Sequence, residues 1–257
     1  MTSLAEITGY LDKILRNSEI PDYDDALNGL QLAHVGPVRR VAAAVDFSLP
    51  SIREAVKGDA NLLLLHHGMF WSGARPLVGP AFERMRLLIS RDIAVYASHI
   101  PLDLHPRFGN NVLLARELEL TPDSPFGVFR GVAIGCAGAC DLPTTELFAR
   151  LSAFAQPLGS TVISTSRDPA RRTRRWAIIT GAGASSSTLR EAADSGVDTL
   201  IVGEGPHHSA VDAMERDIVV MYAGHYATET LGVRALAAEI EREFGIPWFA
   251  VSAPTGL

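Results

Sequence analysis

Three short segments of the sequence each place a histidine beside a second residue that could bind a metal ion. Each segment follows an apolar run typical of a buried strand. The segments are LLLLHH, which ends in His66 and His67, HIPLD, with His99 and Asp103, and GHYATE, with His225 and Glu229. A single histidine after a strand is usually structural, but three such segments together predict a metal site. Neutral imidazoles combined with carboxylates suit Zn, Fe, Mn, Co or Ni.

The spacing of these residues indicates how they could share metal ions. Successive side chains diverge at a strand end, so we expect His66 and His67 to serve two ions side by side rather than to grip one. His225 and Glu229 stand at i and i+4 of a predicted helix and therefore share a face. The two oxygens of the Glu229 carboxylate could bridge two ions, and Asp103 would add a further anionic ligand.

Alternating apolar runs and helical patterns must position these segments. The spacing of apolar residues predicts helices over 2–16, 49–57, 80–90 and 110–118, and buried strands over 39–46, 61–65 and 93–97. This alternation predicts a parallel sheet with helices on its faces. In such open sheets ligands bind beyond the carboxyl ends of the strands, which is where the three segments lie.

The rest of the chain predicts a second α/β layer. After a break with two prolines at 121–125, strands are predicted over 128–135, 161–164, 176–180 and 199–202, with helices over 144–155 and 187–194. A strand over 218–222, a helix over 226–244 and a strand over 247–251 are predicted to return to the first sheet. We therefore predict two α/β domains. The larger is layered around a mostly parallel sheet, comprises 1–125 and 206–257, and binds metal; the smaller covers 126–205 in βαββαβ order.

Other residues are candidates for substrate binding or proton transfer. The turn TGAGASSS, with Gly181 and Gly183, could cradle an anion at a helix N-terminus, or could simply be a sharp turn. GEGPHH, with Glu204, His207 and His208, could contact substrate or supply acid and base groups, and a solvated loop is the alternative.

The histidine of HIPLD has a separate predicted role. His99 stands four residues before Asp103. We expect it to support the metal ligands or to transfer protons rather than to bind an ion itself.

Composition and charge argue against several classes of protein. With 23 Lys and Arg against 29 Asp and Glu, the net charge is −6, so there is no strong nucleic-acid signal. No apolar run reaches the roughly 18 residues that cross a membrane, and no secretory leader is visible. Cys136 and Cys140 are interpreted as strand residues in a reducing, cytoplasmic setting. The basic segment RDPARRTRR at 167–175 predicts a solvated or intersubunit salt-bridge loop, with a local anion contact as the alternative.

At the level of motifs the chain resembles the NIF3-like family, also called the DUF34 or GTP cyclohydrolase 1 type 2 family. The motifs that carry the resemblance are LLLLHHGMFW, HIPLDLH, GNNVLLARELEL, GHYATET, DALNGLQL, TGAGASS and VGEGPHH. They cover nearly the whole chain in the family's order, in its short form without the inserted domain. VGE replaces the family's usual TGE, and the segment before Asn28 lacks the usual Trp, so the chain departs from the family's pattern at these two places.

The resemblance implies a dinuclear centre with two divalent metal ions per chain. His67 and Asp103 would bind one ion, His66 and His225 the other, and Glu229 would bridge them. It also implies a ring-shaped homohexamer built as a trimer of dimers.

These observations predict a dinuclear metal-dependent hydrolase acting on a small molecule, either a nucleotide, as the family's name suggests, or a phosphoester. Glu229 and His99 are the expected catalytic residues. Glu204, His207, His208, Gly181 and Gly183 are the expected substrate contacts. Two alternatives remain open: a metal-binding oligomeric scaffold or regulator without turnover, and a metal chaperone or insertase.

Overall fold

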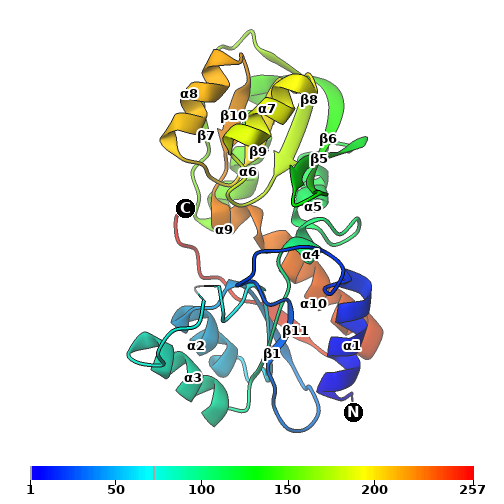
Figure 1. Cartoon of the computed structure of the whole chain (residues 1–257), viewed down its shortest axis with the longest axis vertical. Coiled ribbons are helices and arrows are strands. Elements are labelled where there is room, and N and C mark those ends of the chain that lie inside the picture. The colour runs from blue at the N-terminus through cyan, green and yellow to red at the C-terminus, as the bar shows by residue number, and fades with distance from the viewer. Residues whose placement is uncertain (1, 72) are drawn as a thin grey trace. The chain divides into compact units, whose positions relative to one another are not determined.

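The computed structural model describes residues 2–71 and 73–257, which divide into two compact units (Figure 1). The first unit is Met1–Phe108 with Gly232–Ala253, and the second is Gly109–Leu231 with Pro254–Leu257. The boundaries predicted from sequence, at 125/126 and 205/206, therefore differ from the observed ones. No described helix is long and apolar enough to cross a membrane.

The first unit is a five-stranded sheet in the order β1-β4-β3-β2-β11. Its strands are β1 (Gly29–Leu32), β2 (Val41–Asp46), β3 (Leu62–His67), β4 (Ala94–Ala97) and β11 (Trp248–Ala250), and its helices are α1 (Leu4–Leu15), α2 (Leu49–Lys57), α3 (Pro80–Ser90), α4 (Ile100–Asp103) and most of α10 (Thr230–Phe244). All neighbouring strands are parallel except β1 and β4. The mostly parallel sheet is as predicted. β1 was missed, because it lies in a polar segment without an apolar run.

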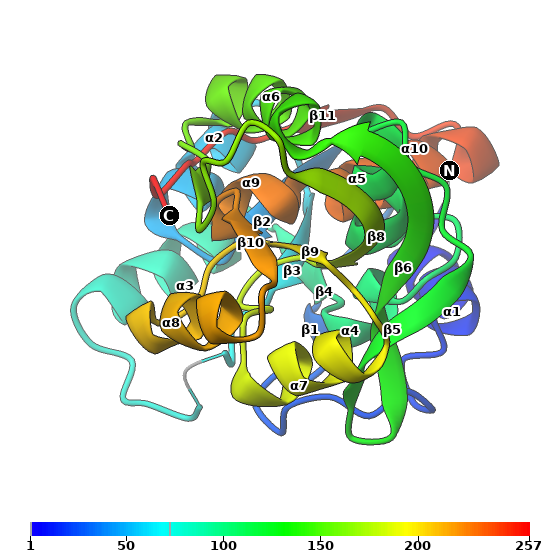
Figure 2. The ribbon, with the colours of Figure 1, turned by 90° about the horizontal axis from the view of Figure 1, so that it is seen from above.

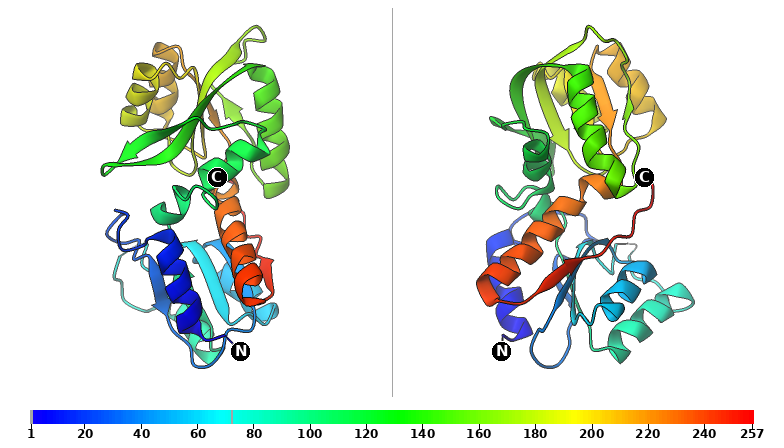
Figure 3. Two further views of the ribbon diagram at one scale, coloured as in Figure 1. Left: turned by 90° about the vertical axis from the view of Figure 1, so that its right-hand side faces the viewer. Right: turned by 180° about the vertical axis from the view of Figure 1, so that it is seen from behind.

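Two hydrophobic layers cover the faces of this sheet, as Figure 3 shows with α1 and α10 on one side and α2 and α3 on the other. The leucines of β3 alternate between the layers: Leu62 and Leu64 pack with α1 and α10, and Leu63 and Leu65 pack with α2 and α3. A strand buried on both faces needs an unbroken apolar run, which is why LLLL precedes the two histidines.

The second unit is a six-stranded mixed sheet in the order β5-β6-β8-β9-β10-β7. Its strands are β5 (Ser124–Phe129), β6 (Val132–Pro143), β7 (Ile163–Ser164), β8 (Arg172–Ile179), β9 (Thr199–Val202) and β10 (Val219–Tyr222), and its helices are α5 (Asn110–Glu117), α6 (Thr144–Ala155), α7 (Ser186–Asp194), α8 (His207–Glu215) and α9 (His225–Thr228), with a 3-10 turn at Gln156–Leu158. Figure 2 shows α5, α6 and α9 on one face of this sheet and α7 and α8 on the other. The predicted α/β fold class, with two sheets, is confirmed.

Two predictions for this unit were wrong. The strand at 218–222 does not return to the first sheet: β10 runs parallel to β9, with Val219 opposite Thr199, because α8 forms an unpredicted crossover between them. The single strand predicted over 128–135 is a hairpin, because Arg130 and Gly131 both adopt positive φ, of 46° and 86°, and turn the chain. β11 does return to the first sheet, beside β2, and most of α10 packs on that sheet as predicted.

A buried carboxylate ties α10 to the rest of the first unit. Glu239 accepts hydrogen bonds from Arg242 at 2.8 Å, Tyr10 at 2.7 Å and Arg107 at 3.1 Å. The hydrogen bond from Arg242 is the main cause that lowers the pKa of Glu239 from 4.5 to about 2, against the opposing effect of burial. This carboxylate therefore stays charged in the folded protein under mildly acidic conditions.

We expect Glu239→Gln to lower the free energy of unfolding by about 1 kcal/mol at pH 7, because the charged hydrogen bonds from the arginines are lost. The loss is no larger because solvent screens the charges of these partly exposed arginines. The pKa is depressed in the folded state, so this stabilisation is present above about pH 4.5 and disappears as the pH falls towards 2. Urea unfolding at pH 7 and pH 3 measures the difference. Glu243→Gln, on the same helix and more exposed, is the control. Equal losses at both pH values would contradict the assignment.

Candidate metal-binding residues in each unit

Three histidine rings meet at the carboxyl ends of β3 and β4 in the first unit. His66 and His67 end β3, and His99 follows β4. The centroids of His66 and His67 are 4.8 Å apart, and that of His99 lies 4.9 Å from the first and 5.5 Å from the second. All three are buried, and one ring nitrogen of each lies within 4.8 Å of the others. These histidines could hold a metal ion, and His66 and His67 lie closer together than the divergence of strand residues led us to expect.

Each ring is held through Nδ1 by a group that can only accept a hydrogen bond. The partner of His66 is the Ser98 carbonyl at 3.1 Å, that of His67 is Asp46 at 2.8 Å, and that of His99 is Asp22 at 2.8 Å. The proton must therefore sit on Nδ1 in the neutral ring, which leaves the lone pair on Nε2. Histidines that bind metals are oriented in this way by a carboxylate or carbonyl.

Asp103 joins this cluster from α4. Its carboxylate is buried, with Oδ2 3.5 Å from Nε2 of His66. The first unit thus contains three of the predicted metal ligands, His66, His67 and Asp103, on adjacent elements.

Asp22 was not predicted, yet it organises this region. It accepts hydrogen bonds from Nδ1 of His99, the side chain of Asn28 and the backbone N–H of Ile100, the first residue of α4. Burial alone would raise the pKa of Asp22, but the hydrogen bond and charge of His99, together with the bond from Asn28, outweigh it and lower the pKa. Asn28 in turn accepts the N–H of His99, which explains one residue of the DALNGLQL motif.

The Gln31 side chain of the same motif fixes the chain after His67. Its oxygen accepts the N–H of Met69 at 2.6 Å, and a Cβ at Gly68 would lie 2.3 Å from its amide nitrogen. Gly68 therefore leaves room for Gln31. The DALNGLQL motif thus positions two segments that carry histidines: Asn28 holds the segment of His99, and Gln31 holds the segment after His67.

In the second unit, His225 and Glu229 face each other as their spacing predicted. Nε2 of His225 lies 3.1 Å from Oε2 of Glu229, and Nδ1 of His225 lies 2.9 Å from Glu204. Burial opposes a charge on His225, but the hydrogen bonds and charges of Glu229 and Glu204 outweigh it and raise its pKa to about 9. The two carboxylates therefore stabilise a proton on this ring, and a bound cation would replace that proton. Glu204 was predicted as a substrate contact. In the structure its carboxylate contacts Nδ1 of His225, just as Asp22 and Asp46 contact Nδ1 of their histidines.

The glycine-rich turn after β8 packs directly against Glu229. Gly181 has φ +65°, and a Cβ there would lie 2.1 Å from Oε1 of Glu229 and 3.2 Å from Nε2 of His225. The Gly181 N–H donates to Thr228 at 3.1 Å. Gly183 is required by a second close approach, because its Cβ would lie 2.5 Å from the carbonyl oxygen of Ile179. Close packing thus accounts for both glycines without a ligand.

The remaining predicted residues lie on or near α8. His207 and His208 begin this helix and are exposed. His207 lines a cavity of about 380 Å³ together with Glu204 and Tyr222, whereas His208 does not line it. Their roles as substrate contacts stay a prediction.

Two further features of this unit have structural explanations. Cys136 is buried, which raises its pKa to about 12, and the Cys140 thiol donates to the Thr173 carbonyl. Both fit the strand-residue interpretation. Within the basic segment 167–175, three arginines pair with acidic residues of the same unit: Arg171 with Asp217, Arg172 with Asp141, and Arg175 with Asp123.

We expect Asp46→Ala to weaken metal binding about 10- to 100-fold, because His67 would lose the acceptor that fixes its orientation. Asp46→Asn keeps a hydrogen-bond acceptor without the charge and should recover part of the loss. Competition against a chromogenic chelator measures both affinities. Unchanged binding in Asp46→Ala would show that the orientation of His67 does not depend on this carboxylate.

Comparison with known proteins places these residues in a wider context. The family model described as Duf34/NIF3 (NGG1p interacting factor 3) matches residues 2–254. A Deinococcus radiodurans protein named "GTP cyclohydrolase 1 type 2 homolog" is 42% identical over 252 residues, covering 98% of this chain and 94% of the relative.

Solved structures share the fold along the whole chain. Protein ybgI, described as of unknown function, matches with a TM-score of 0.89 at 30% identity, and TTHA1606 from Thermus thermophilus matches with 0.82 at 34% identity. Both matches cover 100% of each chain.

Proposed function

The chain belongs to the Duf34/NIF3 family, and from this premise we propose that it is a metal-dependent hydrolase with a two-metal centre. The observation that carries the proposal is the uniform anchoring of four histidines through Nδ1, by Ser98, Asp46, Asp22 and Glu204. This anchoring directs the lone pair of each neutral ring to Nε2, which suits imidazole ligation of a transition metal.

The family resemblance assigned Asp103 to the same ion as His67, but Oδ2 of Asp103 lies 3.5 Å from Nε2 of His66, so the proposed set places His66 and Asp103 on one divalent ion. His67 and His225 would hold the other ion, and Glu229 would serve both. The donors are imidazole nitrogens and carboxylate oxygens only, so Zn, Fe, Mn, Co and Ni all fit. Asp103 and Glu229 are buried carboxylates, and a nearby positive charge lowers the cost of burying a carboxylate. Resident cations would provide that charge.

The surrounding residues would orient the ligands and move protons. Divalent ions at such a centre supply Lewis acidity, which lowers the pKa of water and stabilises negative charge on the substrate. His99 is a suited proton carrier, because Asp22 holds its Nδ1 and leaves Nε2 to accept or donate a proton. Glu204 fixes the ring of His225 in the same manner.

A nucleotide is the first substrate class to test, because curated relatives carry the name GTP cyclohydrolase 1 type 2 homolog. A phosphoester is the second class. The cavity at Glu204 and His207 is a proposed place for part of the substrate, and we propose that the chain works as a cytoplasmic homohexamer, a trimer of dimers.

Elemental mass spectrometry on protein purified without added metal or tag histidines tests the proposal first. We expect about two transition-metal ions per chain, followed by turnover of GTP or a phosphoester in that metal. Near-zero metal that reconstitution cannot restore would reject the hydrolase. Tight metal without turnover on the whole panel would favour the scaffold or regulator, and transfer of metal to a recipient protein would favour the chaperone.

A further inference from the structure

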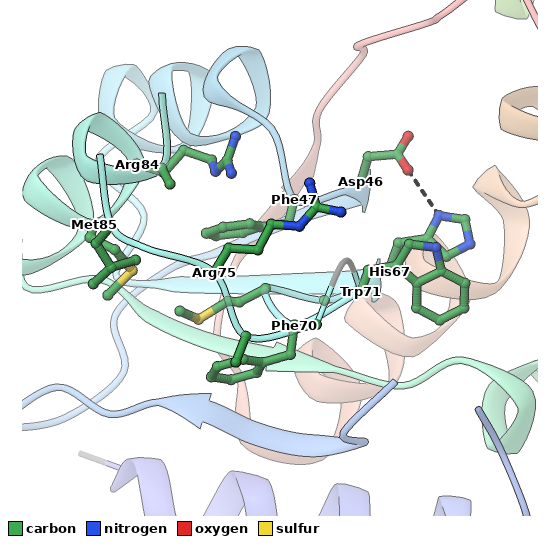
Figure 4. Close-up of a pocket in the computed structure, with 14 residues that line it drawn as sticks. Asp46, Phe47, His67, Phe70, Trp71, Arg75, Arg84 and Met85 are labelled. Atoms are coloured by element: carbon green, nitrogen blue, oxygen red, sulfur yellow. Dashed lines mark hydrogen bonds and ion pairs between the residues drawn. The ribbon is translucent and has the colours of Figure 1, made fainter. Parts of the chain in front are cut away.

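A cavity of about 400 Å³ opens beside His67, entirely within the first unit (Figure 4). Its walls come from the ends of β2 and β3, from residues among 68–71 and 73–77, and from α3. The volume lies in the range of small-molecule sites. His67, a candidate metal ligand, therefore forms part of one wall, and the cavity extends from His67 towards α3.

Arg84 on α3 lines this cavity, and no ion pair joins it to another of the described residues. Its guanidinium lies over the ring of Phe47, 5.3 Å from the centroid, and among the residues that the structure describes its buried Nε has no hydrogen-bond partner. Arg86, two residues along the same helix, is instead paired with Glu83 at 2.8 Å. An arginine carries five N–H donors, and a cation–π contact satisfies none of them.

A second arginine and several aromatic rings complete the walls. Figure 4 shows Arg75 and Arg84 both extending towards Phe47, with Phe70 and Trp71 on other sides of the cavity. Trp71 also lies 4.7 Å from the ring of His67, centroid to centroid. The cavity therefore combines positive charge with flat apolar surfaces.

The acidic residue in the wall already has a partner of its own. Asp46 lines the cavity, but its carboxylate accepts the hydrogen bond from Nδ1 of His67. The guanidinium of Arg84 therefore faces the cavity while the carboxylate orients a histidine. Such a cavity favours an anion, and the planar guanidinium is suited to bidentate contacts with phosphate or carboxylate.

We propose that this cavity binds the anionic group of the substrate, with Arg84 as its principal contact and the aromatic walls packing on the adjoining ring. The inference rests on the proposed function, since it takes the reacting part of that substrate to lie at His67. It names the substrate class as a flat molecule that carries a phosphate or carboxylate. Arg84 would then determine specificity without taking part in the chemistry.

Calorimetric titration of the full-length protein with phenyl phosphate, before and after removal of metal with a chelator, tests this proposal. Benzoate replaces the phosphate by a carboxylate, and benzyl alcohol is the uncharged control. We expect Arg84→Met to weaken binding of phenyl phosphate about tenfold or more in both forms of the protein. Arg84→Lys should be intermediate, and Arg86→Met, which removes the same charge from the same helix, should match the wild type.

The other outcomes separate the anion site from the proposed function. Equal effects of Arg84→Met and Arg86→Met, or equal affinity for benzyl alcohol, would overturn the anion site. Binding that requires metal and ignores Arg84→Met would also overturn it while leaving the hydrolase proposal intact. Binding that depends on Arg84 in a protein that never retains metal would support the site and reject the proposed function instead.

Discussion

Glu229→Ala is expected to abolish both metal loading and turnover while leaving the fold intact. Glu229 is almost fully buried and lies 3.1 Å from Nε2 of His225, and the proposed centre uses its two oxygens as the bridge between ions. Removal of a bridging carboxylate takes one ligand from each ion and leaves their mutual repulsion uncompensated. The loss should therefore exceed that for any ligand of a single ion.

Elemental mass spectrometry and a GTP and phosphoester screen on the same preparation measure this effect. His66→Ala removes a ligand of one ion and should also lose metal and turnover. Glu243→Ala, which removes a partly exposed carboxylate of α10, is the matched control and should behave as wild type. Circular dichroism checks that each variant is folded. Retained turnover in a metal-free Glu229→Ala protein would reject the hydrolase mechanism.

The sequence predicted the buried strands and their histidines well, because both depend on local patterns. A run such as LLLLHH identifies a two-sided buried strand by itself, and the i, i+4 spacing of His225 and Glu229 brings them face to face within one helical turn. Such local patterns can be recognised without knowing which strands are neighbours. The order of strands in a sheet cannot be derived from local patterns, and β10 was therefore assigned to the wrong sheet.

The carboxylates that anchor the histidines could not be predicted by the same reasoning. Asp22 and His99 are 77 residues apart, and Asp46 and His67 are 21 apart, so each pair depends on tertiary structure. Asp46 had one usable signal, its position as the last residue of a predicted strand. Asp22 had none beyond its place among other acidic residues in a polar segment.

The glycine-rich turn shows a different limit of sequence reasoning. A glycine is required wherever a Cβ would collide, whether the neighbour is a bound phosphate or a side chain of the same protein. TGAGASSS before a helix left an anion cradle and a simple sharp turn both open, and in the structure Gly181 packs against the Glu229 carboxylate. The two explanations make different predictions for a methyl group added at Gly181. It would block a bound anion in the first case and displace the Glu229 carboxylate in the second.

Gly181→Ala is therefore expected to lose metal binding, with an effect of at least about tenfold on affinity. The new Cβ would stand 2.1 Å from Oε1 of Glu229, so the carboxylate must move away from its position beside His225. Positive φ also disfavours alanine here, by about 1 kcal/mol. A chelator competition titration measures the affinity, and thermal unfolding measures the backbone effect.

Gly196→Ala separates these two contributions. Gly196 has φ +69°, close to the +65° of Gly181, but a Cβ there meets nothing within 4 Å. Both variants should therefore lose similar stability through backbone strain, and only Gly181→Ala should lose metal. If Gly181→Ala instead retained metal and raised KM for a phosphorylated substrate, the turn would be an anion cradle, the first of the two alternatives that its sequence left open. Normal metal binding by Gly181→Ala would show that the Glu229 carboxylate can shift and still bind the metal ions. The close approach of Gly181 would then not be needed to position Glu229.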